Sequence, residues 1–445
     1  MVAGRFNHNP SGGETCHSIH RKDTENHEVQ NLAVPKNLSD PLLIEWVKSA
    51  HNPIMTPVNG IDPFFYRDPT TAWQGPNKRW RVIVGSQTDG HGTAILYTSE
   101  DFVNWTRSES PLHSSNRTGM WECPDFYPDH YVIGHYDPKT DIYVVNTDFM
   151  DSALQLRYDY GKFYASKTFL DSGKKRRVLW AWIEETDSES DDIEKGWSGL
   201  RYKHNMRGFC FFLFLFKSFP RTVSIGKSGE QLAQWPIKEI EKLRSEEVNI
   251  HDKELKGGSV LEVVGITGSQ AEWSQNQASV EGLLGPFGLL VLASKDLTEQ
   301  TAIFFRIFRS HSKYVVLMSS LRDEVEKTTY GAFVDVDPSS ETVSLRSLTS
   351  ALTNMSASGL RKPSGCQRPK LQIDHSIVES FGGEGVACIT ARVYPKLATD
   401  KEAHLYAFNN GTQSVKISKL SAWSMKEAQF FQYRKEESHF SNYDE

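Results

Sequence analysis

The chain has 445 residues, which exceeds the usual size of one domain and predicts two or three domains with room for substantial cores. Aromatic residues make up 11% of it and the formal net charge is -6, as expected for an ordinary globular protein. The sequence has no basic face for phosphate backbones and no acidic tail. We therefore expect no nucleic-acid partner.

The cysteines are five in number, widely spaced and without a C-x-x-C pair, so they predict neither a zinc site nor a disulfide framework. The sequence opens with Met1-Val2-Ala3-Gly4-Arg5 and polar residues, which is not the pattern of a secretory signal. Asn-x-Ser/Thr triplets nevertheless match the N-glycosylation pattern at Asn37, Asn104, Asn116, Asn354 and Asn410. Because this pattern is short and permissive, it indicates a secretory ancestor only weakly.

Short apolar and aromatic runs, separated by Gly, Asp, Pro and Ser, predict an all-β protein. The runs include residues 80–84, 94–97, 178–182, 289–292 and 302–305. After Trp235-Pro236, Ile237, Ile240 and Leu243 recur at three-residue spacing, and Pro is favoured at a first helical position. We interpret residues 235–244 as a linker helix between β domains at 1–234 and 245–428, with a tail at 429–445.

Two segments differ in character from their surroundings. Residues 201–217 contain an unbroken apolar run that is far shorter than the roughly 20 residues of a membrane span, so we expect no membrane partner. This segment is either a buried strand or an insertion with no place in the fold. Residues 349–372 are rich in Ser, Thr, Gly, Lys and Arg without periodicity, which predicts a loop or a disordered insertion.

Two clusters place a carboxylate among aromatic residues and beside a proline: Tyr66-Arg67-Asp68-Pro69-Thr70-Thr71-Ala72-Trp73 and Trp121-Glu122-Cys123-Pro124-Asp125-Phe126. Aromatic and thiol neighbours exclude water and favour a neutral acid, which suits Glu122 to general-acid work. The guanidinium of Arg67 would instead keep Asp68 ionised, ready to accept hydrogen bonds or to stabilise positive charge on a sugar ring. By composition alone, both clusters are more often structural.

The same two clusters resemble two of the three catalytic signatures of glycoside hydrolase family thirty-two. The resemblance covers most of residues 28–427. Within the family, the sequence is similar to the branch of plant cell-wall invertases and fructan exohydrolases. The further matching stretches are residues 30–36, 156–169, 195–200, 285–298 and 373–383. The family resemblance implies a five-bladed β-propeller, here with an incomplete first blade, followed by a β-sandwich.

The retaining mechanism of that family uses an aspartate nucleophile, a glutamate acid/base and a second aspartate that stabilises the transition state. The resemblance therefore implies that Glu122 is the acid/base and Asp68 the stabiliser. It also implies that Arg67 and Asp125 bind or orient the fructosyl unit and that Cys123 tunes the acidity of Glu122. The implied substrate is sucrose or an inulin- or levan-type fructan, with no cofactor and no metal, and the oligomeric state is not indicated.

The nucleophile motif of the family, Trp-Met-Asn-Asp-Pro-Asn-Gly, does not occur in this sequence. In its nearest match, Asn7-His8-Asn9-Pro10-Ser11-Gly12, Asn9 stands at the aspartate position, unless the match derives from a later Tyr-Gln-Tyr-Asn-Pro segment. Neither alternative positions a carboxylate, whereas a retaining glycosidase needs two carboxyl groups about 5 Å apart. Against the family pattern, residues 201–217 and 349–372 resemble translated intron or other inserted sequence. A further alternative is therefore that the natural transcript encodes a sequence without these two segments.

The same signatures serve sucrose hydrolysis and terminal fructose removal from fructans. Pro124 favours the cell-wall-type branch. Leu154 stands where many sucrose-cleaving members carry lysine, although Asp151 matches their aspartate, so fructan exohydrolase is slightly favoured over invertase. The alternative is a catalytically dead relative that at most binds fructosyl sugars. Because such relatives work in the cell wall or the vacuole, we expect one of these locations.

Overall fold

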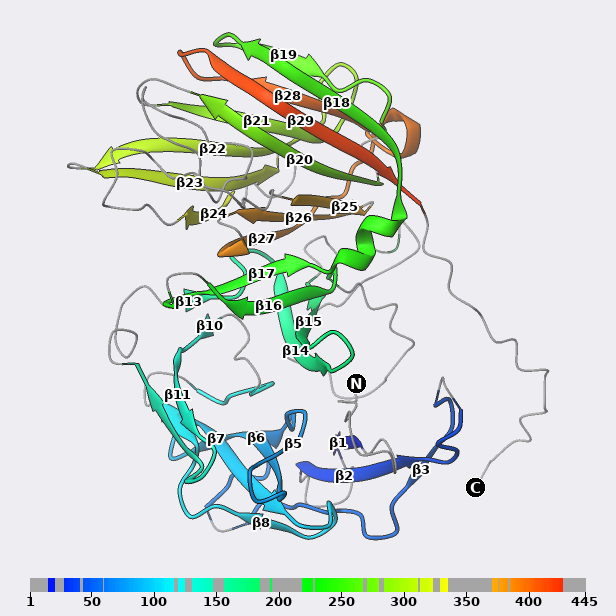
Figure 1. The fold of residues 1–445 in the computed structure, drawn as a ribbon, viewed down its shortest axis with the longest axis vertical. Coiled ribbons are helices and arrows are strands. Elements are labelled where there is room, and N and C mark those ends of the chain that lie inside the picture. Colours follow the sequence, from blue (N-terminus) through cyan, green and yellow to red (C-terminus); the bar gives the residue numbers. More distant parts are fainter. Residues whose placement is uncertain are drawn as a thin grey trace.

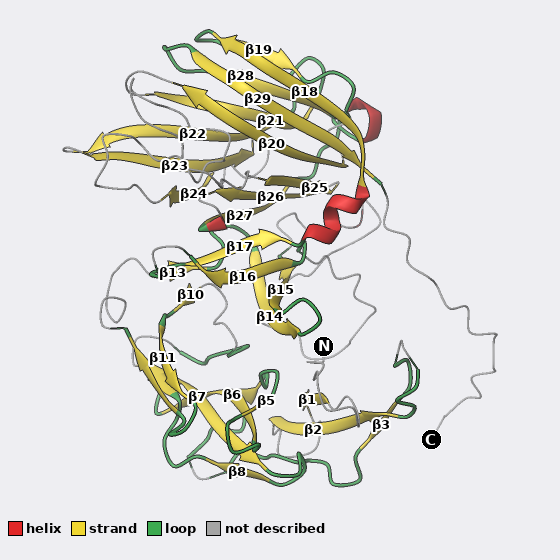
Figure 2. Cartoon of the chain, viewed as in Figure 1, coloured by secondary structure: helices red, strands yellow, loops and turns green. Residues whose placement is uncertain are grey.

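The protein is mostly β-structure, as the alternating runs predict (Figures 1 and 2). The computed structural model describes residues 15–20, 28–40, 43–58, 60–115, 119–124, 130–146, 156–184, 193, 218–226, 229–266, 270–279, 284–310, 313–322, 329–334, 370–374, 376–382 and 385–426. Within these ranges, no helix has the length and apolar character needed to cross a membrane.

The N-terminal part consists of small antiparallel sheets, most of whose strands are close together in the chain. The first contains β1 (Thr15–His20), β2 (Glu28–Pro35) and β3 (Trp46–Lys48). The second contains β4 (Tyr66–Arg67), β6 (Trp80–Thr88), β7 (His91–Ser99) and β8 (Trp105–Arg107), with β5 (Trp73–Gln74) on β6 and β9 (His113–Ser115) on β7. The others are β10 (His130–Tyr131) with β13 (Leu156–Arg157), β11 (Gly134–Asp137) with β12 (Ile142–Val145), and the sheet β14 (Phe163–Asp171), β15 (Arg176–Ile183), β16 (Arg221–Ile225), β17 (Leu232–Pro236).

The β6–β7 hairpin illustrates how the local sequence sets this architecture. Asp89 and Gly90 form the turn with φ values of 51° and 81°, and a two-residue type I′ turn requires positive φ at both positions. Alternate residues of the two strands, such as Val82, Val84 and Ile95, are buried in one hydrophobic core. Along its other side, β6 pairs with β4 through Gly85 and Ser86, so the Arg-Asp-Pro cluster begins at the edge of this sheet.

Among the described residues, the C-terminal part forms two six-stranded sheets, which we call the C-terminal sheet pair. One sheet has the order β18 (Arg244–Leu255), β29 (Val415–Met425), β20 (Gln270–Ser279), β25 (Lys370–Asp374), β26 (Ile377–Gly382), β27 (Ala387–Arg392). The other has the order β19 (Ser259–Glu262), β28 (His404–Asn409), β21 (Leu284–Ala293), β22 (Thr301–Ser310), β23 (Lys313–Arg322), β24 (Thr329–Val334). Both sheets contribute to one core, which includes Leu255, Leu289, Ile303, Val378 and Leu420.

Strands β26 and β27 are buried along their whole length. Val378 and Ala391 lie in the core of the C-terminal sheet pair. On the other face, Phe381 contacts Trp235 of β17, with ring centroids 6.0 Å apart. These two strands are therefore enclosed between the second sheet of the C-terminal sheet pair and the β14–β17 sheet, which Figure 1 shows directly below them.

The predicted linker helix differs in position and type from the structure. Trp235 and Pro236 end strand β17, where they pair with Thr222 and Arg221 of β16. The helix is a 3-10 helix over Lys238–Leu243, and β18 begins at Arg244. The prediction that Pro236 opens a helix is wrong because the ladder with β16 holds this residue in extended backbone.

Two predicted insertions fall mainly outside the described residues. Residues 201–217 are wholly outside them, as are 349–369 and the predicted tail at 429–445. Residues 370–372 are described, and they form the start of β25, which pairs with β20 and β26. The predicted irregular segment therefore extended three residues too far, since Leu371 and Gln372 take part in a regular β-ladder.

Asp141 joins β6 to the β11–β12 hairpin through two hydrogen-bonding partners. Its carboxylate accepts from Arg81 Nε at 2.5 Å and Nη2 at 2.9 Å, and from the Tyr136 hydroxyl at 2.5 Å. Burial raises the pKa of Asp141, but the hydrogen bonds from Arg81 and Tyr136 outweigh it and lower the pKa below its ordinary value. A lowered folded-state pKa stabilises the fold above the unfolded pKa of about 3.9, and this contribution is lost as the pH falls.

We therefore expect Asp141→Asn to be less stable than the parent chain at about pH 7 and to lose less stability than the parent on going to about pH 3. Urea denaturation at both pH values measures the two differences. Asp252→Asn is the control, because the Asp252 side chain is 71% exposed and forms a surface ion pair with Lys416. An equal acid-induced loss in Asp141→Asn and the parent would contradict the prediction.

Candidate active site

Two loop segments meet at the edge of β4 and β6. Asp68 follows β4 with a left-handed φ of 59°, and Cys123 has a φ of 48°. Gly85 on β6 allows this approach, because a Cβ at that position would lie 2.0 Å from the carbonyl oxygen of Trp121. Trp121 N also donates to Ser86 O at 3.3 Å. The absence of a side chain at Gly85 thus brings the segment that carries Glu122 against the Arg-Asp-Pro cluster.

Arg67 is the centre of the polar cluster formed there. Its Nη2 donates to Glu122 Oε1, and its Nη1 donates to Glu28 Oε1 at 2.8 Å. Its Nε lies 3.8 Å from Asp68 Oδ2. Burial works against the charge of Arg67, but Glu28 and Glu122 outweigh it and raise the pKa of the guanidinium above its ordinary value. One permanently charged cation therefore contacts three carboxylates.

The carboxylates of Glu122 and Asp68 remain accessible to solvent, with side chains 27% and 30% exposed. Glu122 Oε2 accepts a hydrogen bond from the hydroxyl of Tyr164 at 3.0 Å. Asp68 Oδ2 accepts one from the backbone N–H of Cys123 at 3.2 Å. Two accessible carboxyl groups held on one guanidinium form an arrangement that can bind hydroxyl groups and exchange a proton with a bound molecule.

The structure brings together Arg67, Asp68, Glu122 and Cys123, which the sequence analysis names in two separate clusters. The partners of the Glu122 carboxylate, however, are polar: a guanidinium and a phenol. Cys123 contacts Asp68 through its backbone, and a role for its thiol in tuning Glu122 stays a prediction. The predicted site residue Asp125 lies outside the described residues, as do Asn9, Asp151 and Leu154.

Three residues of the cluster were not predicted as site residues. Glu28 is 3% exposed, and its Oε2 accepts from Tyr66 N at 2.9 Å, so it anchors the backbone of β4 as well as Arg67. Lys167 on β14 donates to Pro69 O at 2.7 Å and to Asp68 O at 3.4 Å. Tyr164 and Lys167 lie in a stretch with family resemblance, whereas nothing in the sequence near Glu28 indicates a buried carboxylate.

Metal ligation is not indicated by this geometry. Where the structure is described, no three His, Cys, Asp or Glu side chains are grouped so that they could hold a metal ion. The carboxylates of Glu28 and Glu122 face the Arg67 guanidinium instead, which already supplies the positive charge at this position.

The sequence matches the family models described as the N-terminal domain of glycosyl hydrolases family 32, at residues 15–130 and 127–236, and its C-terminal domain, at residues 239–424. It is 46% identical to an insoluble β-fructofuranosidase isoenzyme of Arabidopsis thaliana, over 92% of this chain and 74% of that protein. It is 44% identical to a fructan 6-exohydrolase of Beta vulgaris, over 92% of this chain and 72% of that protein.

Among solved structures, the chain is similar to fructan 1-exohydrolase IIa of Cichorium intybus. The TM-score is 0.80 at 42% identity, and the match covers 96% of this chain and 84% of that one. A variant of the same Cichorium enzyme has been crystallised with 1-kestose. Since the family models match both parts of the sequence, the chain belongs to glycosyl hydrolase family 32, with plant β-fructofuranosidases and fructan exohydrolases among its relatives.

Proposed function

We propose that the site acts on the terminal fructosyl unit of fructans or sucrose, as a β-fructofuranosidase-class hydrolase. The observation that carries the proposal is the placement of Glu122 and Asp68 on the single guanidinium of Arg67. In the proposed reaction, Glu122 donates a proton to the leaving glycosidic oxygen, and Asp68 stabilises positive charge that develops on the fructosyl ring. Arg67 and Asp125 hold and orient the fructosyl unit.

The covalent half of a retaining reaction needs a nucleophilic carboxylate on the opposite side of the sugar, about 5 Å from the acid/base. Attack by that carboxylate breaks the glycosidic bond, and water, deprotonated by Glu122, then releases fructose with net retention. The sequence contains no Trp-Met-Asn-Asp-Pro-Asn-Gly motif. This observation favours the second candidate function, a relative that binds fructosyl sugars without cleaving them.

The proposed architecture follows the same relatives. Residues 1–234 would form the five-bladed β-propeller, and residues 245–428 would form the β-sandwich. The small sheets of the N-terminal part and the two packed sheets of the C-terminal part support this assignment. The proposed location is the cell wall or the vacuole, in keeping with the insoluble Arabidopsis relative.

Fructan exohydrolase is the slightly favoured activity within this class. Leu154 occupies the position where many sucrose-cleaving members carry lysine, and the relatives include exohydrolases of Beta vulgaris and Cichorium intybus. Rates on sucrose, inulin and levan, measured side by side, decide the preference.

Release of free fructose from these three substrates tests the proposed hydrolase. We expect Glu122→Gln to lower the rate by about 10²–10⁴-fold, because the amide cannot donate the proton that the leaving oxygen needs. Glu109→Gln, which changes an exposed carboxylate in the same part of the chain, should leave the rate unchanged.

Calorimetric titration with 1-kestose separates the two candidate functions. Heat of binding without fructose release would support the non-hydrolytic binder. Fructose release that Glu122→Gln abolishes would support the hydrolase and would require a nucleophile that the family motif does not reveal. A folded sample that neither binds nor cleaves would overturn both candidates.

A further inference from the structure

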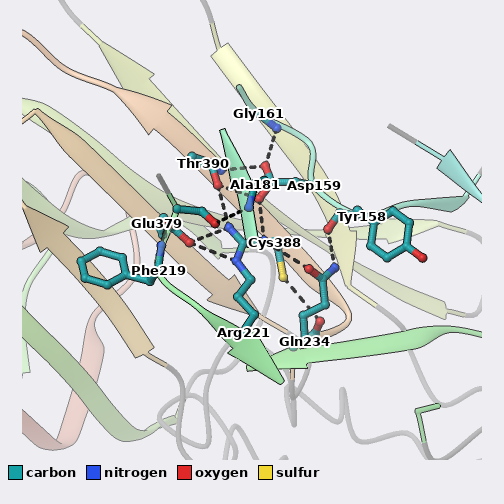
Figure 3. Close-up of polar contacts among 12 residues, drawn as sticks. Tyr158, Asp159, Gly161, Ala181, Phe219, Arg221, Gln234, Glu379, Cys388 and Thr390 are labelled. Carbon is teal, nitrogen blue, oxygen red and sulfur yellow. Dashed lines mark hydrogen bonds and ion pairs between the residues drawn. The ribbon is translucent and has the colours of Figure 1, made fainter. Parts of the chain in front are cut away.

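A buried polar cluster connects the N-terminal sheets to the C-terminal sheet pair (Figure 3). Arg221 of β16 contacts Asp159 through Nη1 at 3.0 Å and Glu379 of β26 through Nη2 at 2.6 Å. The side chains of all three residues are at most 1% exposed. The guanidinium also lies over the rings of Phe163 and Phe381, at 4.3 Å and 4.8 Å from their centroids. Residues from both parts of the chain thus enclose one buried cation.

Thr390 of β27 is the residue through which the C-terminal sheet pair binds Asp159. Its backbone N–H donates to Asp159 Oδ1 at 2.8 Å, and its hydroxyl donates to Asp159 Oδ2 at 2.7 Å. The same hydroxyl oxygen accepts from Arg221 Nη2 at 2.8 Å. Asp159 in turn accepts from the backbone N–H of Gly161 at 2.8 Å. The single hydroxyl of Thr390 therefore has a partner on the N-terminal side both as donor and as acceptor.

The backbone of β27 also holds the residues that follow Asp159. Tyr160 N donates to Cys388 O at 2.8 Å, and Lys162 N donates to Thr390 O at 2.7 Å. The approach at Gly161 is so close that a Cβ there would lie 1.9 Å from Thr390 O. Residues 159–162 thus lie along β27 in a fixed register, which the Asp159 carboxylate reinforces.

The fixed segment leads directly into the candidate active site. Phe163, which begins β14, packs under Arg221, and the next residue, Tyr164, donates to Glu122 Oε2 at 3.0 Å. Three residues further along β14, Lys167 donates to the backbone carbonyl groups of Asp68 and Pro69. Any displacement of residues 159–163 would therefore move Tyr164 relative to the Glu122 carboxylate.

We propose that Thr390 is a positioning residue for the active site: through Asp159 it fixes the segment that places Tyr164 against Glu122. The proposal rests on the proposed function in so far as Glu122 is the reacting carboxyl group. The C-terminal sheet pair thereby sets the geometry of the hydrogen bond between Tyr164 and Glu122 through the segment that contains Asp159. Its contribution is orientation of the Tyr164 hydroxyl, in addition to stabilising the fold.

Two cysteines provide separate reporters that need no substrate. Cys123 is half-buried and follows Glu122 in the chain, so we expect the reactivity of its thiol to change with the charge and geometry around Glu122. Cys388 is fully buried beside Arg221, and burial raises the pKa of its thiol, against the opposing effect of Arg221. Because Cys388 is fully buried at this contact, we expect its thiol to react only when the contact between the two parts of the chain opens.

The experiment is alkylation by iodoacetamide, with the rate at each cysteine followed by peptide mass spectrometry. Thr390→Val removes the hydroxyl, Thr390→Ser retains it, and Tyr164→Phe removes the contact with Glu122 directly. We expect Thr390→Val and Tyr164→Phe to change the Cys123 rate by about threefold or more in the same direction, because thiol reactivity follows local electrostatics. Thr390→Ser should restore the parent rate, and Cys388 should stay unreactive throughout.

Ile417→Val, a core change on β29 away from this contact, is the control for loss of stability and should leave the Cys123 rate unchanged. An unchanged Cys123 rate in Thr390→Val, or a parallel change in Ile417→Val, would overturn the proposal. Labelling of Cys388 together with Cys123 would also overturn it, because the contact would then be opening as a whole. Failure of the proposed function is seen separately, as the absence of fructose release and of 1-kestose binding.

Discussion

Arg221→Met is expected to lower the free energy of unfolding by about 3–5 kcal/mol, because it leaves two buried carboxylates without their cation. Burial works against the charge of Arg221, but Glu379 and Asp159 outweigh it and raise the pKa of the guanidinium above its ordinary value. Gln234 and Thr390 complete its hydrogen bonds, so the substitution removes a fully satisfied charge. The midpoint of urea denaturation at neutral pH measures the loss.

Lys36→Met is the matched control, since Lys36 and Glu45 form an ion pair whose side chains are 64% and 57% exposed. An exposed pair of this kind contributes little to stability, because the solvent screens its charges. A triple variant that adds Asp159→Asn and Glu379→Gln to Arg221→Met should recover part of the loss, because it removes the unpaired charges. If Arg221→Met costs no more than Lys36→Met, the cluster is not a major source of stability.

Phe102→Ala is expected to destabilise the N-terminal part by about 3–5 kcal/mol. Phe102 is 1% exposed and lies between Trp80 and Trp105, with ring centroids 5.2 Å and 5.1 Å away in edge-to-face geometry. The substitution opens a cavity in the core beneath the β6–β7 hairpin and removes both aromatic contacts, each worth about 0.5–1.5 kcal/mol. Tryptophan fluorescence during denaturation follows this core directly, since Trp80 and Trp105 line it.

Phe64→Ala provides the comparison, because Phe64 is 55% exposed in the same part of the chain. A surface change of this kind is expected to alter the stability by less than about 0.5 kcal/mol. Similar denaturation midpoints for the two variants would contradict the assignment of Phe102 to the core. Since β6 pairs with β4, which carries Arg67, Phe102→Ala should weaken the proposed fructosyl binding only at denaturant concentrations where this core begins to unfold.

The sequence predicts the β character and the two carboxylate clusters because both depend on local patterns. Alternation along β6 and β7 and the Asp89-Gly90 turn are properties of neighbouring residues. The tertiary partners are different: Glu28 reaches Arg67 across 39 positions of sequence, and Asp159 reaches Thr390 across 231. No periodicity encodes such pairs, so the buried carboxylates could not be distinguished in sequence from solvated ones.

The helix prediction failed for a related reason. Ile237, Ile240 and Leu243 do have helical spacing, and Ile240 is buried. The preceding Trp235 and Pro236 satisfy their backbone in a ladder with β16, which the spacing of apolar residues cannot indicate. Only the middle of the predicted segment, Lys238–Leu243, is therefore helical.

The burial of β26 and β27 on both faces limits how this protein can be rebuilt from parts. A C-terminal half produced alone would expose Phe381 and an uncompensated Glu379, and would be a poor candidate for a soluble module. In a chimaera with a relative, exchanging β26 and β27 without residues 158–163 would break the hydrogen bonds that join Asp159 to Thr390. The two halves must therefore be inherited, or engineered, as one matched set.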